Sequence, residues 1–150
     1  MHEAIKKAEE NIISGKGGPF GAVVVRDGKI IAAVGNCVTS TNDPTAHAEV
    51  VAIREACKAL GTFDLTGCEI YASCEPCPMC MGAIMWARID KLYYAAERVD
   101  ASRAGFDDEI FYSELSLPAD KRMLKPTQLL RNESNKIFDK WIEESDKILY

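Results

Sequence analysis

The sequence predicts an α/β fold of three layers, in which helices flank a mixed central β-sheet. Two observations carry this prediction. Strand patterns alternate with helical patterns in the middle of the chain, which implies βαβ units with parallel strands. Earlier in the chain, two apolar runs flank Asp27-Gly28, which predicts an antiparallel hairpin. At 150 residues the chain has the length of one domain, expected to span 1–150.

The first part of the chain predicts a helix and then the hairpin. Apolar residues recur at helical spacing from His2 to about Ser14, and Gly15 can end this helix. Its inward residues are expected to be Ile5, Ala8, Ile12 and Ile13. The hairpin strands are expected at 22–26 and 29–34, and loops are expected at 17–21 and 36–44.

The middle of the chain predicts two helices and two strands. Asp43 or Thr45 can cap a helix that runs to about Leu60, with Gly61 as its stop. A second helix is expected from Pro76, at its first position, to about Arg88. The two strands are expected at 69–73 and 91–95.

The last third of the chain has weaker patterns. Residues 104–108 predict a turn that can open a short helix. Residues 132–148 predict an amphipathic C-terminal helix, whose inward side chains are expected to be Ile137, Phe138, Trp141 and Ile142.

Two short segments carry the chemistry. They read Thr45-Ala-His-Ala-Glu49 and Glu75-Pro-Cys-Pro-Met-Cys80, and their spacing is the signature of zinc-dependent deaminases. Imidazole and thiolate are zinc ligands, so His47, Cys77 and Cys80 are expected to hold one Zn²⁺ per chain. Three ligands leave one position for water, and Glu49 is expected to move protons to and from it.

Helix geometry agrees with this ligand set. Cys77 and Cys80 are three residues apart, so they share a helix face near the helix start, where the dipole favours thiolate. His47 and Glu49 would point about 200° apart in a regular helix. His47 is therefore expected at the irregular entry of its helix.

Other roles for the Cys-x-x-Cys pair have to be weighed. A redox pair would leave His47 and Glu49 unexplained. A zinc ribbon needs a second pair, and the remaining cysteines do not form one; they are Cys37, Cys57, Cys68 and Cys74. A structural metal site stays open as an alternative.

Composition and charge limit which binding partners and which cellular compartment are expected. The balance of 47% hydrophobic and 27% charged residues is that of an ordinary soluble domain. A net charge of −5 disfavours tight binding to nucleic acid. The start of the chain lacks the apolar run of a signal peptide, and no stretch approaches a membrane span. We expect a cytoplasmic protein with reduced thiols, in which the four other cysteines are mostly small buried residues.

The chain resembles the cytidine deaminase-like superfamily in Pro44-Thr-Ala-His-Ala-Glu49 and Glu75-Pro-Cys-Pro-Met-Cys-Met-Gly-Ala83. It is similar to the short bacterial guanine deaminases in further segments, and this resemblance runs from Met1 to Tyr150. These segments are Gly18-Pro-Phe-Gly21, Asn36, Ala104-Gly-Phe-Asp-Asp108 and Tyr150. The resemblance implies a cytidine deaminase-like fold, zinc, and hydrolytic deamination of guanine to xanthine and ammonia. It also implies a homodimer that exchanges its C-terminal segments, with a purine base and water as small-molecule partners.

The same resemblance implies roles for further residues. Asp108 would assist the departing amino group, and Asn36 would hydrogen-bond the purine. Tyr150 would lie over the purine of the neighbouring subunit. The remaining residues implied at the base pocket are Phe20, Ala48, Trp86 and Phe106.

On the residues alone, simpler roles remain open. The three aromatic residues can belong to the core, Asn36 can close a turn, and Asp107 or Asp108 can cap a short helix. A terminal residue such as Tyr150 usually frays.

Three other functions remain as alternatives. A tRNA adenosine deaminase shares both zinc motifs, but it needs basic patches for RNA, and the chain is acidic. A cytosine or cytidine deaminase needs a smaller pocket. A non-catalytic zinc-binding interaction module would leave Glu49 without a task.

Overall fold

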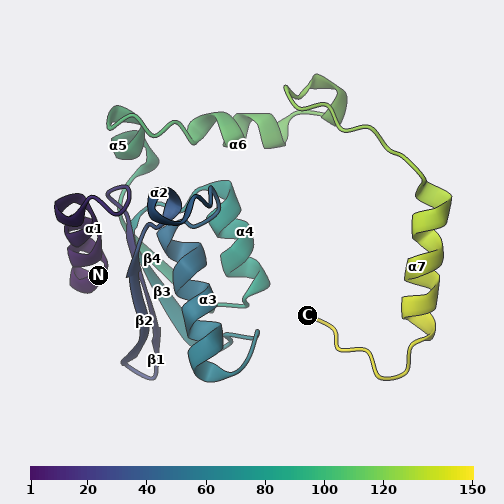
Figure 1. Cartoon of the computed structure of the whole chain (residues 1–150), viewed down its shortest axis with the longest axis horizontal. Coiled ribbons are helices and arrows are strands. Elements are labelled where there is room, and N and C mark those ends of the chain that lie inside the picture. The colour runs from purple at the N-terminus through teal and green to yellow at the C-terminus, as the bar shows by residue number, and fades with distance from the viewer. The chain divides into compact units, whose positions relative to one another are not determined.

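The computed structural model describes residues 1–150, which form two compact units, 1–111 and 112–150. The first unit contains the sheet (Figure 1). The strands are β1 (Gly21–Arg26), β2 (Lys29–Gly35), β3 (Cys68–Cys74) and β4 (Lys91–Ala96). Their order is β2-β1-β3-β4. Because β1 is antiparallel to both neighbours and β3 is parallel to β4, the prediction of a mixed sheet is confirmed.

The hairpin has the turn that its sequence predicts. Arg26 pairs with Lys29, and the two residues between them have positive φ angles of 51° and 72°. Both central residues of this tight turn require such angles, which glycine adopts without strain and aspartate tolerates.

Helices cover both faces of this sheet, which confirms the three layers (Figure 1). The helices of this unit are α1 (His2–Ser14), α2 (Val38–Thr41), α3 (Ala48–Leu60), α4 (Pro78–Trp86) and α5 (Arg98–Arg103). A Cβ on Gly21 would run into α1, whereas the next residue, Ala22, packs in the core with α3. Because successive strand residues point to opposite faces, α1 and α3 lie on opposite sides.

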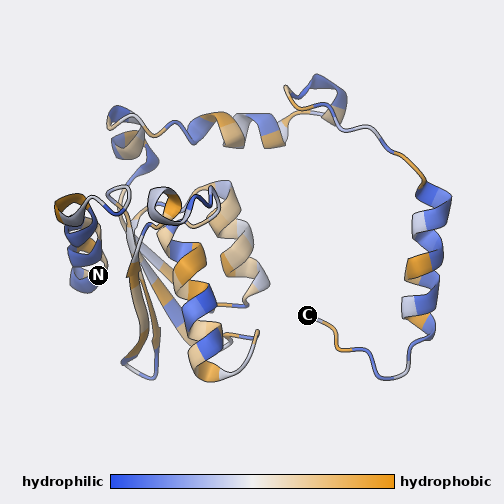
Figure 2. Cartoon of the chain, viewed as in Figure 1, coloured by the Kyte–Doolittle hydropathy of each residue, from blue (hydrophilic) through white to orange (hydrophobic).

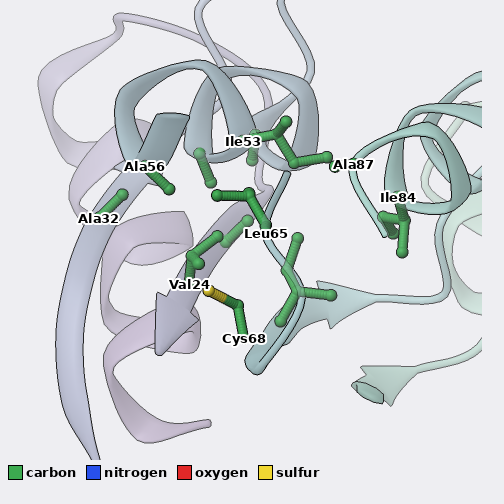
Figure 3. Close-up of a cluster of buried hydrophobic side chains, with 12 residues drawn as sticks. Val24, Ala32, Ile53, Ala56, Leu65, Cys68, Ile84 and Ala87 are labelled. Carbon is green, nitrogen blue, oxygen red and sulfur yellow. The ribbon is translucent and has the colours of Figure 1, made fainter. Parts of the chain in front are cut away.

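The core lies between the sheet and the α3–α4 layer. Figure 3 shows Val24 and Cys68 from the strands gathered with Ile53, Leu65 and Ile84. Alanines on the inner face of α3 let the helix approach the sheet closely; they are Ala48, Ala52 and Ala56. All six cysteines are free.

Two predicted helix starts are wrong. The helix cap expected at Asp43 or Thr45 is His47, because Asp43 instead accepts hydrogen bonds from the backbone N and Oγ1 of Thr45 and closes a turn. In the second helix Cys77 is the cap and the proline in the first turn is Pro78 rather than Pro76. In each case the cap residue itself is extended and carries a metal-ligand side chain.

The inner face of α1 also differs from the prediction. The buried residues are Ala4, Ala8 and Asn11, whereas Ile12 and Ile13 are exposed, as is Ile5. Small side chains face the sheet because Gly21 brings the strand backbone close to the helix. Two short helices, α2 and α5, were not expected, since four and six residues carry too little periodicity to be recognised.

The second unit is built of helices. α6 (Glu109–Ser116) crosses the boundary at residue 111, and a 3-10 turn (Ala119–Lys121) and α7 (Arg131–Glu143) follow. α7 ends before the predicted residue 148, and Lys147 Nζ donates a hydrogen bond to a carbonyl freed by that end. No residue in 112–150 is buried. The four side chains expected to point inward are exposed instead. In Figure 2, α7 is mostly hydrophilic, with short hydrophobic segments between the hydrophilic ones.

The chain contains no helix with the length and apolar character required to cross a membrane.

Candidate metal centre and active site

Three predicted metal ligands come together where α3 and α4 begin. His47 Nδ1 lies 3.7 Å from Cys77 Sγ and 3.5 Å from Cys80 Sγ. The two sulfurs are 3.5 Å apart. No other group of three or more His, Cys, Asp or Glu side chains in the chain converges in this way.

These distances fit zinc. Zn–S bonds of about 2.3 Å and Zn–N bonds of about 2.0 Å in a tetrahedron place two sulfurs about 3.8 Å apart and a sulfur and a nitrogen about 3.5 Å apart. The observed separations of 3.5–3.7 Å match this spacing. One imidazole and two sulfurs form a donor set that zinc prefers, and three ligands leave one position open. The site therefore fits a catalytic zinc ion.

The two helix caps explain the convergence. His47 is in an extended conformation, φ −62° and ψ 152°, so its side chain is not bound by the helical spacing to Glu49. Cys77 is likewise extended, and Cys80 lies on the first turn of α4. The irregular entry predicted for His47 is observed.

Hydrogen bonds between the three ligands shift their pKa values and favour a thiolate at Cys77. Hydrogen bonds from Cys80 and then from His47 lower the pKa of Cys77 to about 4, despite burial. The pKa of Cys80 is raised, chiefly because its proton is held by the Cys77 sulfur. The same sulfur raises the pKa of His47. Zinc binding would displace the remaining protons, since its ligands are thiolates and neutral imidazole.

Glu49 lies in the first turn of α3, beside His47. Its side chain is buried, with 8% of the residue exposed. Burial raises the pKa of this carboxyl, and hydrogen bonding within its own residue opposes the rise. A carboxyl that holds a proton more readily than in water is suited to accept and return one near neutral pH.

A cavity of about 530 Å³ opens beside the ligands. It is lined by the end of the hairpin, the starts of α3 and α4, the end of β3 and the segment from α5 to α6. Its walls include Phe20, Asn36, His47, Glu49, Cys74, Glu75, Cys77, Phe106, Asp108 and Phe111. All these residues belong to the unit 1–111. The cavity is mostly apolar, with a few converging polar groups, as in small-molecule sites.

Asn36 has a defined orientation in the cavity wall. Its Oδ1 accepts hydrogen bonds from the backbone N–H of Val38, at 3.1 Å, and of Gly18, at 3.4 Å. The carbonyl oxygen is therefore occupied, and the amide presents Nδ2, a donor, to other partners. The bond from Val38 closes a turn, as an asparagine at this position can do, and the buried side chain also lines the cavity.

Asp108 carries an unsatisfied acceptor. Its Oδ1 is buried and has no hydrogen-bond partner, and burial raises the pKa of the carboxyl. Asp108 lies just before α6 and lines the cavity. A buried carboxylate oxygen without a partner is costly, which indicates that a ligand or water normally meets it.

Two aromatic rings form part of the wall. Phe20 and Phe106 pack edge to face with ring centroids 4.7 Å apart. Gly18 lies against both rings, where a Cβ would come within 3.2 Å of Phe20 and 3.5 Å of Phe106. The two rings and the glycine loop give the cavity an apolar wall suited to a flat base.

Two predicted base contacts, Trp86 and Ala48, do not line the cavity, and a third, Tyr150 over the neighbouring subunit's purine, stays a prediction. Trp86 does not line the cavity; it ends α4, nine residues after Cys77, and is 65% exposed in this chain. The helix rise of about 1.5 Å per residue carries it away from the ligands. Ala48 is fully buried in the core, and its side chain is absent from the cavity wall. Tyr150 belongs to the second unit.

The sequence assigned no role in the site to two further residues of the cavity wall, although Cys74 was expected to lie close to it. Cys74 lines the cavity and donates a hydrogen bond to Glu97 O, and burial raises its pKa to about 11. Glu75 accepts a hydrogen bond from the backbone N of Arg98, which ties the end of β3 to α5. The position of Glu75 inside the zinc motif is the signal that could have identified it.

The decisive comparison is with a family model. Residues 1–96 match the cytidine and deoxycytidylate deaminase zinc-binding region. The match covers more than half of the chain and includes the three metal ligands and Glu49. The chain belongs to this deaminase family.

Individual relatives of this deaminase extend the match. The guanine deaminase of Bacillus subtilis (strain 168) is 51% identical over 150 residues, which is 100% of this chain and 96% of the relative. The X-ray structure of the guanine deaminase from Bacillus subtilis superposes with a TM-score of 0.96, covering 99% of this chain and 95% of that one. The tRNA-specific adenosine deaminase of Bacillus subtilis is 46% identical over 96 residues, which is 64% of this chain and 59% of the relative.

Proposed function

We propose that this deaminase removes the amino group of guanine by hydrolysis and releases xanthine and ammonia. The observation that carries the proposal is the convergence of four features in one cavity. They are the ligand set of His47 and two cysteines, the buried carboxyl of Glu49, the unpartnered oxygen of Asp108 and the oriented amide of Asn36. The full-length similarity to a guanine deaminase supports guanine as the base.

The chain's own groups divide the chemistry. When bound, zinc supplies a Lewis acid that lowers the pKa of water in its open position to about 7. Glu49 lines the cavity beside His47, where it takes a proton from water and gives it to a ring nitrogen of the base. It then takes the proton of the hydroxyl that has added to the ring carbon and gives it to the departing amine, so that the carbonyl forms as ammonia leaves. Asp108 Oδ1 offers an acceptor to the amino group that leaves. The apolar wall of Phe20 and Phe106 excludes water around the base.

Base selection rests on hydrogen bonds with buried partners. Asn36 Nδ2 donates to an acceptor on the purine, because its Oδ1 is already bonded to the backbone. A buried donor that loses its acceptor costs about 1–3 kcal/mol, so the site disfavours a base without that group.

We expect guanine to be preferred over cytosine by at least about 10²-fold in kcat/KM, and tRNA to be inert. Ammonia release from guanine, adenine, cytosine and tRNA measures this preference at equal enzyme concentration. Because guanine carries no phosphate, its turnover should depend little on salt, unlike the turnover of a tRNA. Efficient conversion of adenosine to inosine in a tRNA hairpin would contradict guanine deamination and favour the tRNA-editing alternative.

We also propose that the active unit is a single deaminase domain assembled as a homodimer, whose C-terminal segment closes the neighbouring site. The observation is the exposed apolar surface of the second unit: no residue of 112–150 is buried, and α7 and the terminus carry large apolar side chains. They include Ile137, Phe138, Trp141, Ile142, Ile148, Leu149 and Tyr150. A segment of this composition needs a partner surface to be stable.

A mixing experiment tests closure in trans. One variant lacks residues 147–150 and the other carries Glu49→Gln, and each is expected to be nearly inactive alone. After joint unfolding and refolding with zinc, a mixed dimer has one site with an intact Glu49 under an intact tail. Random pairing would restore about a quarter of the wild-type activity. Each variant refolded alone is the control. A mixture as inactive as these controls would show that the tail acts on its own subunit.

A further inference from the structure

Asn11 is a buried polar residue on the alanine face of α1. It is 8% exposed and follows Ala4 and Ala8 on that face. Its Nδ2 donates hydrogen bonds to Asn36 O, at 2.6 Å, and to Gly18 O, at 3.1 Å. One side chain thus joins the first helix, the glycine loop and the end of the hairpin.

The surrounding backbone is shaped around this amide. A Cβ on Gly35 would lie 2.5 Å from Asn11 Oδ1, and a Cβ on Gly17 would overlap the Asn36 carbonyl oxygen. Glycine at positions 17 and 35 therefore leaves the space that the Asn11 amide and the Asn36 carbonyl oxygen occupy. The simpler explanation is that Asn11 only stabilises the fold. In that case its substitution would lower stability without a specific effect on substrate binding.

The contacts of Asn11 bear on the orientation of Asn36. Asn36 Oδ1 is held by the backbone N–H groups of Gly18 and Val38. Asn11 holds the carbonyl oxygens of Gly18 and Asn36 themselves. The relative position of these two residues determines whether Asn36 keeps its Oδ1 occupied and its Nδ2 available to the cavity.

We propose that Asn11 is a positioning residue for the purine, which orients the Asn36 amide from behind the cavity wall. This role rests on the proposed function. Asn11 itself does not line the cavity. The hydrogen bonds of its Nδ2 go to Gly18 and Asn36 and involve neither the metal ligands nor Glu49. Loss of the Asn11 donors therefore weakens substrate binding and leaves the chemical step nearly intact.

Asn11→Asp tests this role, since it keeps the shape and replaces the two N–H donors by an oxygen facing two carbonyl oxygens. KM for guanine should rise about tenfold, while kcat changes less than about threefold. Zinc content and thermal midpoint are measured alongside. Ser14→Ala is the matched control on the same helix, because Ser14 Oγ bonds only to the backbone of Asn11. If Asn11→Asp does not fold, Asn11→Ser takes its place.

A double-mutant cycle with Asn36→Ala separates positioning from structure. If Asn11 acts through the Asn36 amide, adding Asn11→Asp to Asn36→Ala should raise KM less than about twofold further. Binding of guanine to Glu49→Gln protein, measured by calorimetry, should weaken about tenfold when Asn11→Asp is added. Additive effects on KM, an unchanged KM, or failure of both Asn11 variants to fold would overturn the proposal. Wild-type protein that releases no ammonia from guanine would refute the proposed function itself, and this inference with it.

Discussion

Glu49→Gln is expected to lower kcat by at least about 10²–10⁴-fold while zinc content stays at about one per chain. The amide has the shape of the carboxyl but cannot carry the proton from water to the base. Glu49 would serve several of these transfers, so the loss should reach or exceed the range typical of one. Single-turnover measurement of guanine conversion, with elemental analysis of the same samples, checks both expectations.

The free energy of unfolding gives an independent readout of the same variant. Burial raises the pKa of Glu49, so its charged form is disfavoured in the folded protein at neutral pH. The neutral amide should therefore leave stability unchanged or increase it. Glu55→Gln is the matched control, because Glu55 is exposed on the same helix. A Glu49→Gln protein with nearly its full rate would mean that another group moves the protons.

Cys80→Ala is expected to lose zinc and activity together. Its sulfur lies 3.5 Å from both other ligand atoms and is fully buried, so the substitution removes one of the three ligands from inside the site. Elemental analysis should fall from about one zinc per chain to a small fraction, and the thermal midpoint should fall with it. Added zinc should no longer raise the thermal midpoint.

Cys68→Ala provides the control for this second prediction. Cys68 is also fully buried, but it packs in the core with Val24 and Leu65. Its replacement should cost about 1 kcal/mol of stability and leave the zinc content unchanged. Stoichiometric zinc in the Cys80→Ala protein would show that the metal is held elsewhere.

Local sequence determined the features that depend on a few neighbouring residues. The hairpin followed from Asp27-Gly28, whose backbone angles few other pairs adopt easily. The convergence of His47 with the two cysteines followed from motif spacing, because each motif sits at a helix start, where an extended cap leads into the first turn. The cap of α3 was not predictable from the sequence. Asp43 and Thr45 both have side chains that commonly cap helices, whereas the observed cap, His47, does not.

Tertiary structure alone decided what depends on residues far apart in the chain. Asn11 faces inward because Gly21 and Gly35 let the helix approach the sheet, although the isoleucines of α1 carry the stronger apolar signal. The orientation of Asn36 depends on a loop 18 residues earlier. Trp86 has an aromatic ring suited to a base, but the helix rise places it outside the cavity. Sequence patterns report hydrophobicity and local geometry; which polar groups meet in the cavity depends on contacts between segments, which only the folded chain brings together.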